Sequence, residues 1–180
     1  MTSSRTRFYD MSYSDTEHCL TPTHTTLPHE DNDSQFTGLC LSPPRANETF
    51  IIRHPQTNLV VTLKSGKLCL DTLDIINSNC HWRIIETPTG WLGFRNIQSD
   101  TYIRHNNSWN HWNWKFVADV KHHSLWEYFS TRPGPDGRHE LLVKHWFGFR
   151  GMRIGGEKGR ELMVAKQGEK GVAWEFIKVG

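Results

Sequence analysis

The sequence predicts an all-β domain made of three copies of one strand pattern. Two signatures recur three times after residue 45, the short apolar runs between them are β-branched or aromatic, and no stretch there shows helical periodicity. Four short strands in each of three pseudo-repeats make about twelve. We therefore predict a β-trefoil, a closed antiparallel barrel with three-fold pseudosymmetry. A three-bladed propeller is the alternative, but it would have fewer blades than propellers usually do.

Each copy opens with an apolar run that ends in a basic residue and then His or Asn, and it closes with a Trp and large apolar residues. The opening signatures are Ile51-Ile52-Arg53-His54, Gly93-Phe94-Arg95-Asn96 and Leu142-Val143-Lys144-His145, and the closing signatures are Trp82-Arg83-Ile84-Ile85, Trp126-Glu127-Tyr128-Phe129 and Trp174-Glu175-Phe176-Ile177. The closing Trp follows the opening signature by 28, 30 and 29 residues. We expect all three closing Trp side chains in the core.

The runs inside each copy predict two further strands. Their β-branched and aromatic residues are bounded by turn residues such as Ser65-Gly66 and Gly155-Gly156. The expected strands lie at residues 59–62, 102–104 and 152–154, and then at residues 67–70, 115–118 and 162–165.

Residues 1–45 differ in composition from residues 46–180, which we assign to the trefoil. The first segment is rich in Ser, Thr, His, Asp and Pro, and its net charge is −3 against +5 for the rest. It is predicted to be an irregular or disordered N-terminal arm, because it lacks the apolar residues needed to offset chain entropy. An extended arm docked on the domain by its aromatic residues is the other interpretation, and the opposite charge favours it.

Composition narrows the classes of partner. The net charge of the whole chain is +2, which is too low for a protein whose main partner is nucleic acid. No run of 18 apolar residues or secretory leader occurs, so we expect no membrane span and a cytoplasmic location. Four cysteines without a C-x-x-C pair are expected to be reduced. A monomer or weak homo-oligomer is expected.

Two of the copies also resemble a known family. The second copy, through Trp91-Leu92-Gly93-Phe94-Arg95-Asn96, Tyr102-Ile103, Val117-Ala118 and Trp126-Glu127-Tyr128-Phe129, resembles one fascin-type trefoil repeat, and the third copy is similar through Met163-Val164-Ala165 and Trp174-Glu175-Phe176-Ile177-Lys178-Val179. Over residues 46–180 the chain resembles small single-domain fungal fascin-like trefoil proteins. The resemblance implies barrel packing and, because fascin bundles actin with several trefoils, a protein-interaction module as one candidate function.

One connection differs from its counterparts. Where the first and third copies have short turns, the second copy carries residues 106–114, which include three Trp residues. Trp supplies a large contact area for little conformational entropy, so this loop predicts a recognition surface. The alternative is that these side chains close the end of the barrel or pack on the N-terminal arm.

The residues near this loop are the candidate site. A His or Asn can hydrogen-bond a carbonyl as charge develops on it, and a second aromatic wall is expected after the third opening signature. The candidate catalytic residues are His105, Asn110 and His111, and the candidate substrate-binding residues are Trp109, Trp112, Trp114, His122, Trp146 and Phe147.

This set favours binding of one apolar, oxygenated small molecule, such as a terpenoid or polyketide, in an aromatic pocket. No nucleophile, phosphate-binding or metal-ligand motif occurs, so we expect no metal and no cofactor. Any chemistry would then be a cofactor-free cyclisation, cycloaddition or isomerisation of secondary metabolism, in which the protein holds the substrate in a reactive conformation.

Two alternatives stay open. The first is a lectin-like, carbohydrate-binding trefoil, although such proteins usually carry similar sites on all three units and these loops are dissimilar. The second is the fascin-like module that binds actin or another protein, for which a Trp-rich patch would be the hot spot.

Overall fold

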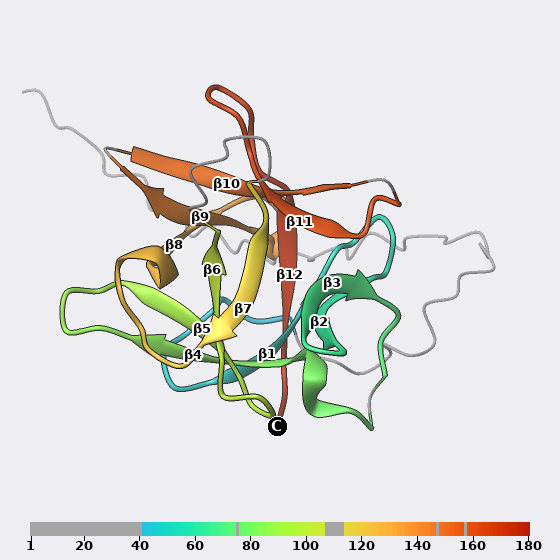
Figure 1. The fold of residues 1–180 in the computed structure, drawn as a ribbon. Helices are drawn as coiled ribbons and strands as arrows, with labels where there is room; N and C mark the ends of the chain where they lie inside the picture. Colours follow the sequence, from blue (N-terminus) through green and yellow to red (C-terminus); the bar gives the residue numbers. More distant parts are fainter. Residues whose placement is uncertain (1–40, 75, 107–113, 147, 157) are drawn as a thin grey trace, which may run out of the picture. The chain divides into compact units, whose positions relative to one another are not determined.

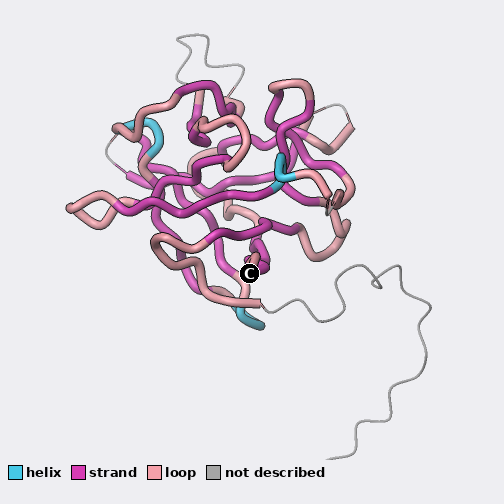
Figure 2. Tube along the Cα trace, turned by 90° about the horizontal axis from the view of Figure 1, so that it is seen from below, coloured by secondary structure: helices cyan, strands magenta, loops and turns pink. Residues whose placement is uncertain are grey.

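The computed structural model describes residues 41–180 apart from residues 75, 107–113, 147 and 157. The described part of the chain is built from β-strands joined by loops and short 3-10 turns (Figures 1 and 2). Its strands are β1 (Thr49–Arg53), β2 (Val60–Lys64), β3 (Lys67–Asp71), β4 (His81–Glu86), β5 (Leu92–Asn96), β6 (Tyr102–His105), β7 (Phe116–Val120), β8 (Phe129–Pro133), β9 (His139–His145), β10 (Gly148–Gly155), β11 (Glu161–Val164) and β12 (Ala173–Lys178).

Six strands form a closed antiparallel barrel. Their order around the barrel is β1, β4, β5, β8, β9 and β12, and β12 pairs back to β1. The other strands form the hairpins β2–β3, β6–β7 and β10–β11, each paired to the barrel strand that precedes it. This threefold arrangement of barrel strands and hairpins confirms the predicted β-trefoil.

The turns follow from the sequence. Ser65 and Gly66 join β2 to β3 with φ angles of 50° and 74°, and the strands resume pairing at Lys64 and Lys67. Two positive φ angles in a two-residue loop match the right-handed twist of the hairpin, and Gly adopts such angles without strain. The predicted turn at Gly155-Gly156 is likewise present, with Gly156 at φ 80°.

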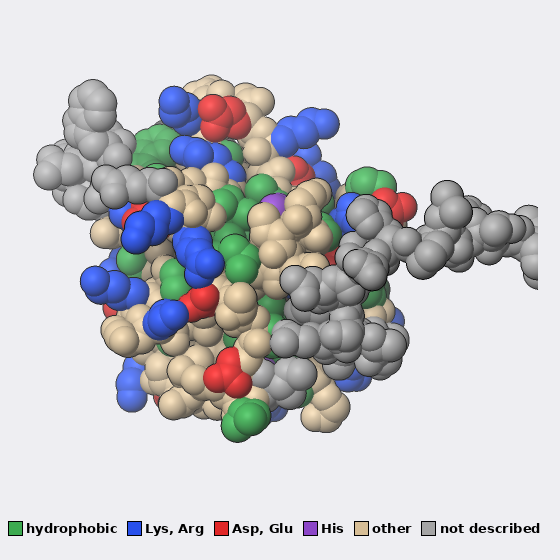
Figure 3. Space-filling model, turned by 90° about the vertical axis from the view of Figure 1, so that its right-hand side faces the viewer, with side chains coloured by type: hydrophobic (Ala, Val, Ile, Leu, Met, Phe, Trp, Pro, Cys, Tyr) green, Lys and Arg blue, Asp and Glu red, His purple; other side chains and the backbone are tan. Residues whose placement is uncertain are grey.

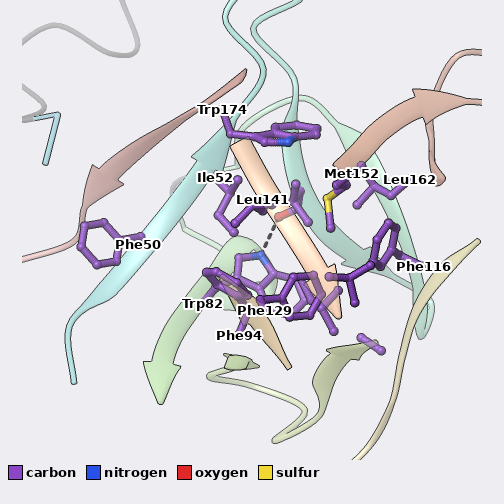
Figure 4. Packing of buried hydrophobic residues seen from close by; sticks show 14 of the residues in the cluster. Phe50, Ile52, Trp82, Phe94, Phe116, Phe129, Leu141, Met152, Leu162 and Trp174 are labelled. Atoms are coloured by element: carbon purple, nitrogen blue, oxygen red, sulfur yellow. Dashed lines mark hydrogen bonds between the residues drawn. The ribbon is translucent and has the colours of Figure 1, made fainter. Parts of the chain in front are cut away.

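The barrel interior is filled by large apolar side chains from all three copies (Figure 4). Trp82 and Trp174 are fully buried, as predicted for closing signatures. The Nε1 atom of Trp82 donates a 2.8 Å hydrogen bond to the carbonyl of Val61, drawn as a dashed line in Figure 4. Among the described residues, Nε1 of Trp174 has no hydrogen-bond partner.

The prediction that all three closing Trp side chains lie in the core is wrong for one of them, Trp126. Trp126 lies in the 3-10 turn Leu125–Glu127 and is half-buried, so it is not a core residue. The backbone N–H of Ser124 donates to Oε2 of Glu127 at 2.8 Å, which is the bond that the Glu of a capping box accepts, and the Ser124 hydroxyl donates to the same oxygen at 2.8 Å. These bonds stabilise the turn. The barrel strand of this copy therefore begins only at Phe129, which is fully buried.

A buried ion-pair cluster links the first and last strands. The side chain of Arg53 in β1 contacts Glu175 in β12 at 2.7 Å, and Arg138 contacts the same carboxylate at 3.3 Å. Glu175 is only 5% exposed. Because a buried carboxylate is stable only when it is paired, this cluster fixes β12 against β1 and against Arg138, the residue that precedes β9.

Part of the predicted arm is described. Leu41 forms a bridge to Ile177 of β12, and the N–H of Ser42 donates to the carbonyl of Phe176 at 3.0 Å. Residues 1–40, which make up the rest of the predicted arm, lie outside the described residues. Within the described residues no helix is both long enough and apolar enough to cross a membrane.

Candidate functional site

An exposed Trp stands on a tight turn of the third copy. Strands β9 and β10 resume pairing at His145 and Gly148, so the turn between them is short. Trp146 in this turn has a φ of 46° and is 63% exposed. The left-handed region is unfavourable for a bulky side chain, at a cost of about 1–3 kcal/mol, and such strained residues cluster at binding sites.

Trp146 stands at the rim of a groove of about 570 Å³. The groove runs between the β9–β10 turn and the loop that joins β11 to β12, and its lining residues are His145, Trp146, Gly148, Phe149, Arg150, Gln167 and Gly168. We call it the third-unit groove. A Cβ placed on Gly148 would meet nothing within 4 Å, so the groove is open at that point.

Strand alternation divides the lining residues between two faces. Lys144 of β9 pairs with Phe149 of β10, so these two side chains lie on one face of the hairpin. His145 and Arg150 each follow one of these residues along their strand, so their side chains lie on the opposite face. Arg150 and His145 therefore share one face, and Phe149 points to the other. There the ring of Phe149 lies 5.7 Å from that of Trp91, so its side chain packs at the edge of the groove.

The loop opposite the turn is fixed by a contact between two glycines. A Cβ on Gly151 of β10 would lie 2.5 Å from the backbone N of Gly171, so only glycine lets the loop approach the strand so closely. The turn of the loop closes through the N–H of Glu169, which donates to the carbonyl of Lys166 at 3.1 Å. This arrangement brings Oε1 of Gln167 to 3.4 Å from Nη2 of Arg150.

Trp146 belongs to a cluster of five aromatic rings. The ring of His145 is 5.0 Å from Trp114 and 5.3 Å from His105, while Trp126 is 4.7 Å from His105 and 6.0 Å from Trp146. We call these residues the His-Trp cluster. It joins β6, β9, the 3-10 turn that carries Trp126, and Trp114, which lies two residues before β7, so it couples the second copy to the third.

His105 is the buried member of this cluster. It is 2% exposed, and burial lowers the pKa of its imidazole to about 4, with His145 and Arg104 acting in the same direction. A hydrogen bond to the backbone of Lys144 opposes the shift. The ring is therefore neutral near pH 7, and among the described residues its Nε2 has no hydrogen-bond partner.

The structure brings together three of the predicted site residues. His105, Trp114 and Trp146 meet around His145, although Trp114 packs against the core and is not freely exposed. His122 is exposed and follows β7 at the end that pairs with Tyr102, about 10 Å along the hairpin from the end where His105 lies. It is therefore not part of the cluster. The predicted residues Trp109, Asn110, His111, Trp112 and Phe147 lie outside the described residues.

Sequence reasoning missed Arg150 and Gln167. Neither belongs to a motif, and the two are 17 residues apart in the sequence. The sequence feature that could have indicated them is the pair Gly151 and Gly171. Isolated glycines in or beside strands often mark a close approach of two backbones, and here that approach brings the loop carrying Gln167 beside Arg150.

A different pair of grooves lies where the three hairpins meet. The groove of about 590 Å³ is lined by Lys115, Lys158, Arg160 and Glu161, among others, and the groove of about 430 Å³ shares Lys115 and Glu161 with it. Lys and Arg side chains gather on the face seen in Figure 3. The two shared residues form an ion pair at 2.7 Å, so part of this positive charge is already compensated.

Among the described residues, no three His, Cys, Asp or Glu side chains lie together as metal ligands would.

Comparisons with known proteins support the fold. No protein-family model and no curated protein matches this sequence. The fascin-like assignment and the fungal origin therefore stay predictions. Solved β-trefoil structures do match the chain, at low sequence identity.

Three solved structures illustrate the match. The designed three-fold symmetric protein ThreeFoil aligns with a TM-score of 0.61 and 9% identity, over 73% of this chain and 99% of its own. The ricin B-like lectin of Macrolepiota procera, solved with lactose, aligns with a TM-score of 0.62 and 12% identity, over 77% of this chain and 100% of its own. SeviL, solved with the asialo-GM1 saccharide, aligns with a TM-score of 0.58 and 14% identity, over 75% and 100%. At such low sequence identity, these matches show that the fold is shared and nothing more.

Proposed function

We propose that this chain is a carbohydrate-binding β-trefoil and that it takes a saccharide in the third-unit groove. The observation that carries the proposal is Trp146, a large indole held 63% exposed in a left-handed turn conformation. A fold that only needed a turn would place Gly or Asn there, because these residues adopt such φ angles at little cost. The strained indole is best explained by what it contacts when a ligand is present.

The groove offers the two kinds of contact that a sugar needs. The face of Trp146 provides a flat apolar surface for the C–H groups of a pyranose ring. The guanidinium of Arg150 and the amide of Gln167, which also line the groove, provide planar hydrogen-bonding groups. These side chains come from the β9–β10 hairpin and the β11–β12 loop, which the Gly151–Gly171 contact holds together.

The solved relatives support the same function. The Macrolepiota procera lectin was solved with lactose and SeviL with the asialo-GM1 saccharide, so this fold binds saccharides in those proteins. These relatives favour the lectin-like alternative over the apolar-guest hypothesis of the sequence analysis. The third-unit groove also fits an apolar guest poorly. Trp146 is 63% and Phe149 49% exposed, so the groove does not seal a guest from water, whereas a hydroxylated ligand gains from solvent-exposed polar contacts.

The test is a glycan array followed by calorimetric titration of the best glycan. We expect Kd values near the millimolar to micromolar range for a single shallow site. The substitutions Trp146→Asn and Gly148→Leu should each abolish binding, the first by removing the indole and the second by filling the groove. Trp146→Asn should leave Tm within a few degrees, because Asn tolerates the left-handed region.

The matched control is Trp91→Ala. It removes an aromatic residue that contacts Phe149 but does not line the groove, so glycan binding should persist. Absence of binding on the array, or binding that survives both Trp146→Asn and Gly148→Leu, would contradict the proposal.

A further inference from the structure

The guanidinium and amide side chains that line the third-unit groove, Arg150 and Gln167, present mainly hydrogen-bond donors. Arg150 presents N–H groups only, and the Oε1 of Gln167 already accepts from Arg150 at 3.4 Å, so the free end of this amide is its NH₂ group. No carboxylate is among the described lining residues. Sugar hydroxyls both donate and accept, so a neutral sugar would leave its own donors poorly matched here.

Arg150 also differs from the neighbouring arginine of its strand. Arg153, three residues further along β10, has Glu169 at 3.8 Å. That carboxylate also accepts the N–H of Lys166 at 3.0 Å, so it is held away from Arg150. Within the described residues Arg150 forms no ion pair, and its one side-chain hydrogen bond goes to a neutral amide. In the part of the chain that the structure describes, no carboxylate compensates its charge beside the groove.

We propose that the saccharide bound in the third-unit groove is acidic, with a carboxylate or sulfate held by Arg150 and Gln167 while its ring lies against Trp146. This inference rests on the proposed carbohydrate-binding function and adds the ligand class. A guanidinium binds a carboxylate or sulfate through two parallel N–H···O bonds, and such charge-assisted bonds are about twice as strong as neutral ones. The Gly151–Gly171 contact keeps Gln167 beside Arg150 before a ligand arrives, which limits the entropy lost on binding.

The experiment uses pairs of probes that differ only in charge. Methyl galactoside is compared with methyl galacturonide, in which a carboxylate replaces the C6 hydroxymethyl group, and with methyl galactoside 6-sulfate, by calorimetry at low and at moderate salt. We expect at least one acidic probe to bind tenfold or more tightly than the neutral one, and the advantage to shrink as salt rises. The carboxylate and sulfate arms show which acidic group is preferred.

Variants assign the effect to Arg150. Arg150→Gln should remove the tenfold preference for the acidic probe over the neutral one, because an amide carries no charge to pair with a carboxylate or sulfate. The control Arg83→Gln removes the same charge from an exposed position on β4 and should leave both affinities unchanged.

The outcomes separate the two proposals. Equal affinity of the native chain for neutral and acidic probes would overturn the acidic ligand class and leave carbohydrate binding intact. An acidic preference that survives Arg150→Gln would overturn the assignment to this groove. If the native chain bound neither the neutral nor the acidic probes, both the carbohydrate-binding function and the acidic ligand class would be overturned.

Discussion

His105 lies edge to face against Trp126, with ring centroids 4.7 Å apart and ring planes at 88°. The imidazole faces Trp126 on one side and His145 on another, with Arg104 on its own strand, and among the described residues no acidic group beside it favours the charged form. A ring that is neutral in the fold and charged when unfolded makes stability depend on pH.

The first prediction concerns this dependence. The pKa of His105 is about 4 in the fold and 6.5 when unfolded, so the unfolded chain binds more protons between these values. The stabilisation is fully present above pH 6.5 and is lost as the pH falls toward 4, by about 3 kcal/mol for this group alone. His105→Phe should flatten the dependence of the free energy of unfolding on pH, measured by urea denaturation, whereas His122→Phe, at an exposed position, should not. An unchanged slope in the first variant would show that His105 titrates normally.

The second prediction compares two buried indoles. Trp82→Phe and Trp174→Phe remove the same atoms from fully buried positions, but only Trp82 donates a hydrogen bond to a described partner, the Val61 carbonyl. The first change leaves a buried acceptor without this donor, and the second removes an unsatisfied N–H. We expect Trp82→Phe to be the more destabilising by about 1–2 kcal/mol, measured by chemical denaturation. Equal losses would mean that Nε1 of Trp174 is satisfied in solution.

The third prediction tests the glycine contact behind the groove. Gly151→Ala forces its Cβ against the backbone of Gly171, so the β11–β12 loop must move. We expect a loss of about 1–3 kcal/mol in stability, or a Tm lower by several degrees. Gly148→Ala on the same strand places its methyl group in open space and should change Tm little, which makes it the matched control for stability.

The fourth prediction contrasts a buried and an exposed ion pair. Glu175→Gln leaves the Arg53 and Arg138 guanidinium groups without their shared carboxylate, which should cost about 3 kcal/mol or more of unfolding free energy. Asp119→Asn breaks the Arg104 pair where the acid is 53% exposed, and should cost less than about 1 kcal/mol. Comparable losses in the two variants would argue against the structural role given to Glu175.

The fold could be predicted because its determinants are local and repeated. Each opening run and each turn such as Ser65-Gly66 encodes its own strand or hairpin, and three copies reinforce one another. Trp126 was misplaced because the repeat pattern was followed over a local signal. The sequence Ser124-Leu125-Trp126-Glu127 is itself a capping-box pattern, and that pattern decides the backbone there.

The site was harder to predict because contacts distant in sequence create it. Pseudosymmetry makes Trp146 a candidate site residue, since it follows an opening signature directly. The pairing of Arg150 with Gln167 depends on how closely two backbones approach at Gly151 and Gly171, and no pattern in either segment encodes that distance. The direction of the pKa shift of His105 depends likewise on rings supplied by other strands.

The pairing of β12 with β1 has a wider consequence. Phe50 pairs with Lys178, whose Nζ lies 2.8 Å from Oε1 of Glu48, so the two ends of the trefoil's strand sequence are held side by side. A circular permutant that joined residue 180 to residue 46 through a short linker and opened at the Ser65-Gly66 turn would keep every strand pairing of the six-stranded barrel.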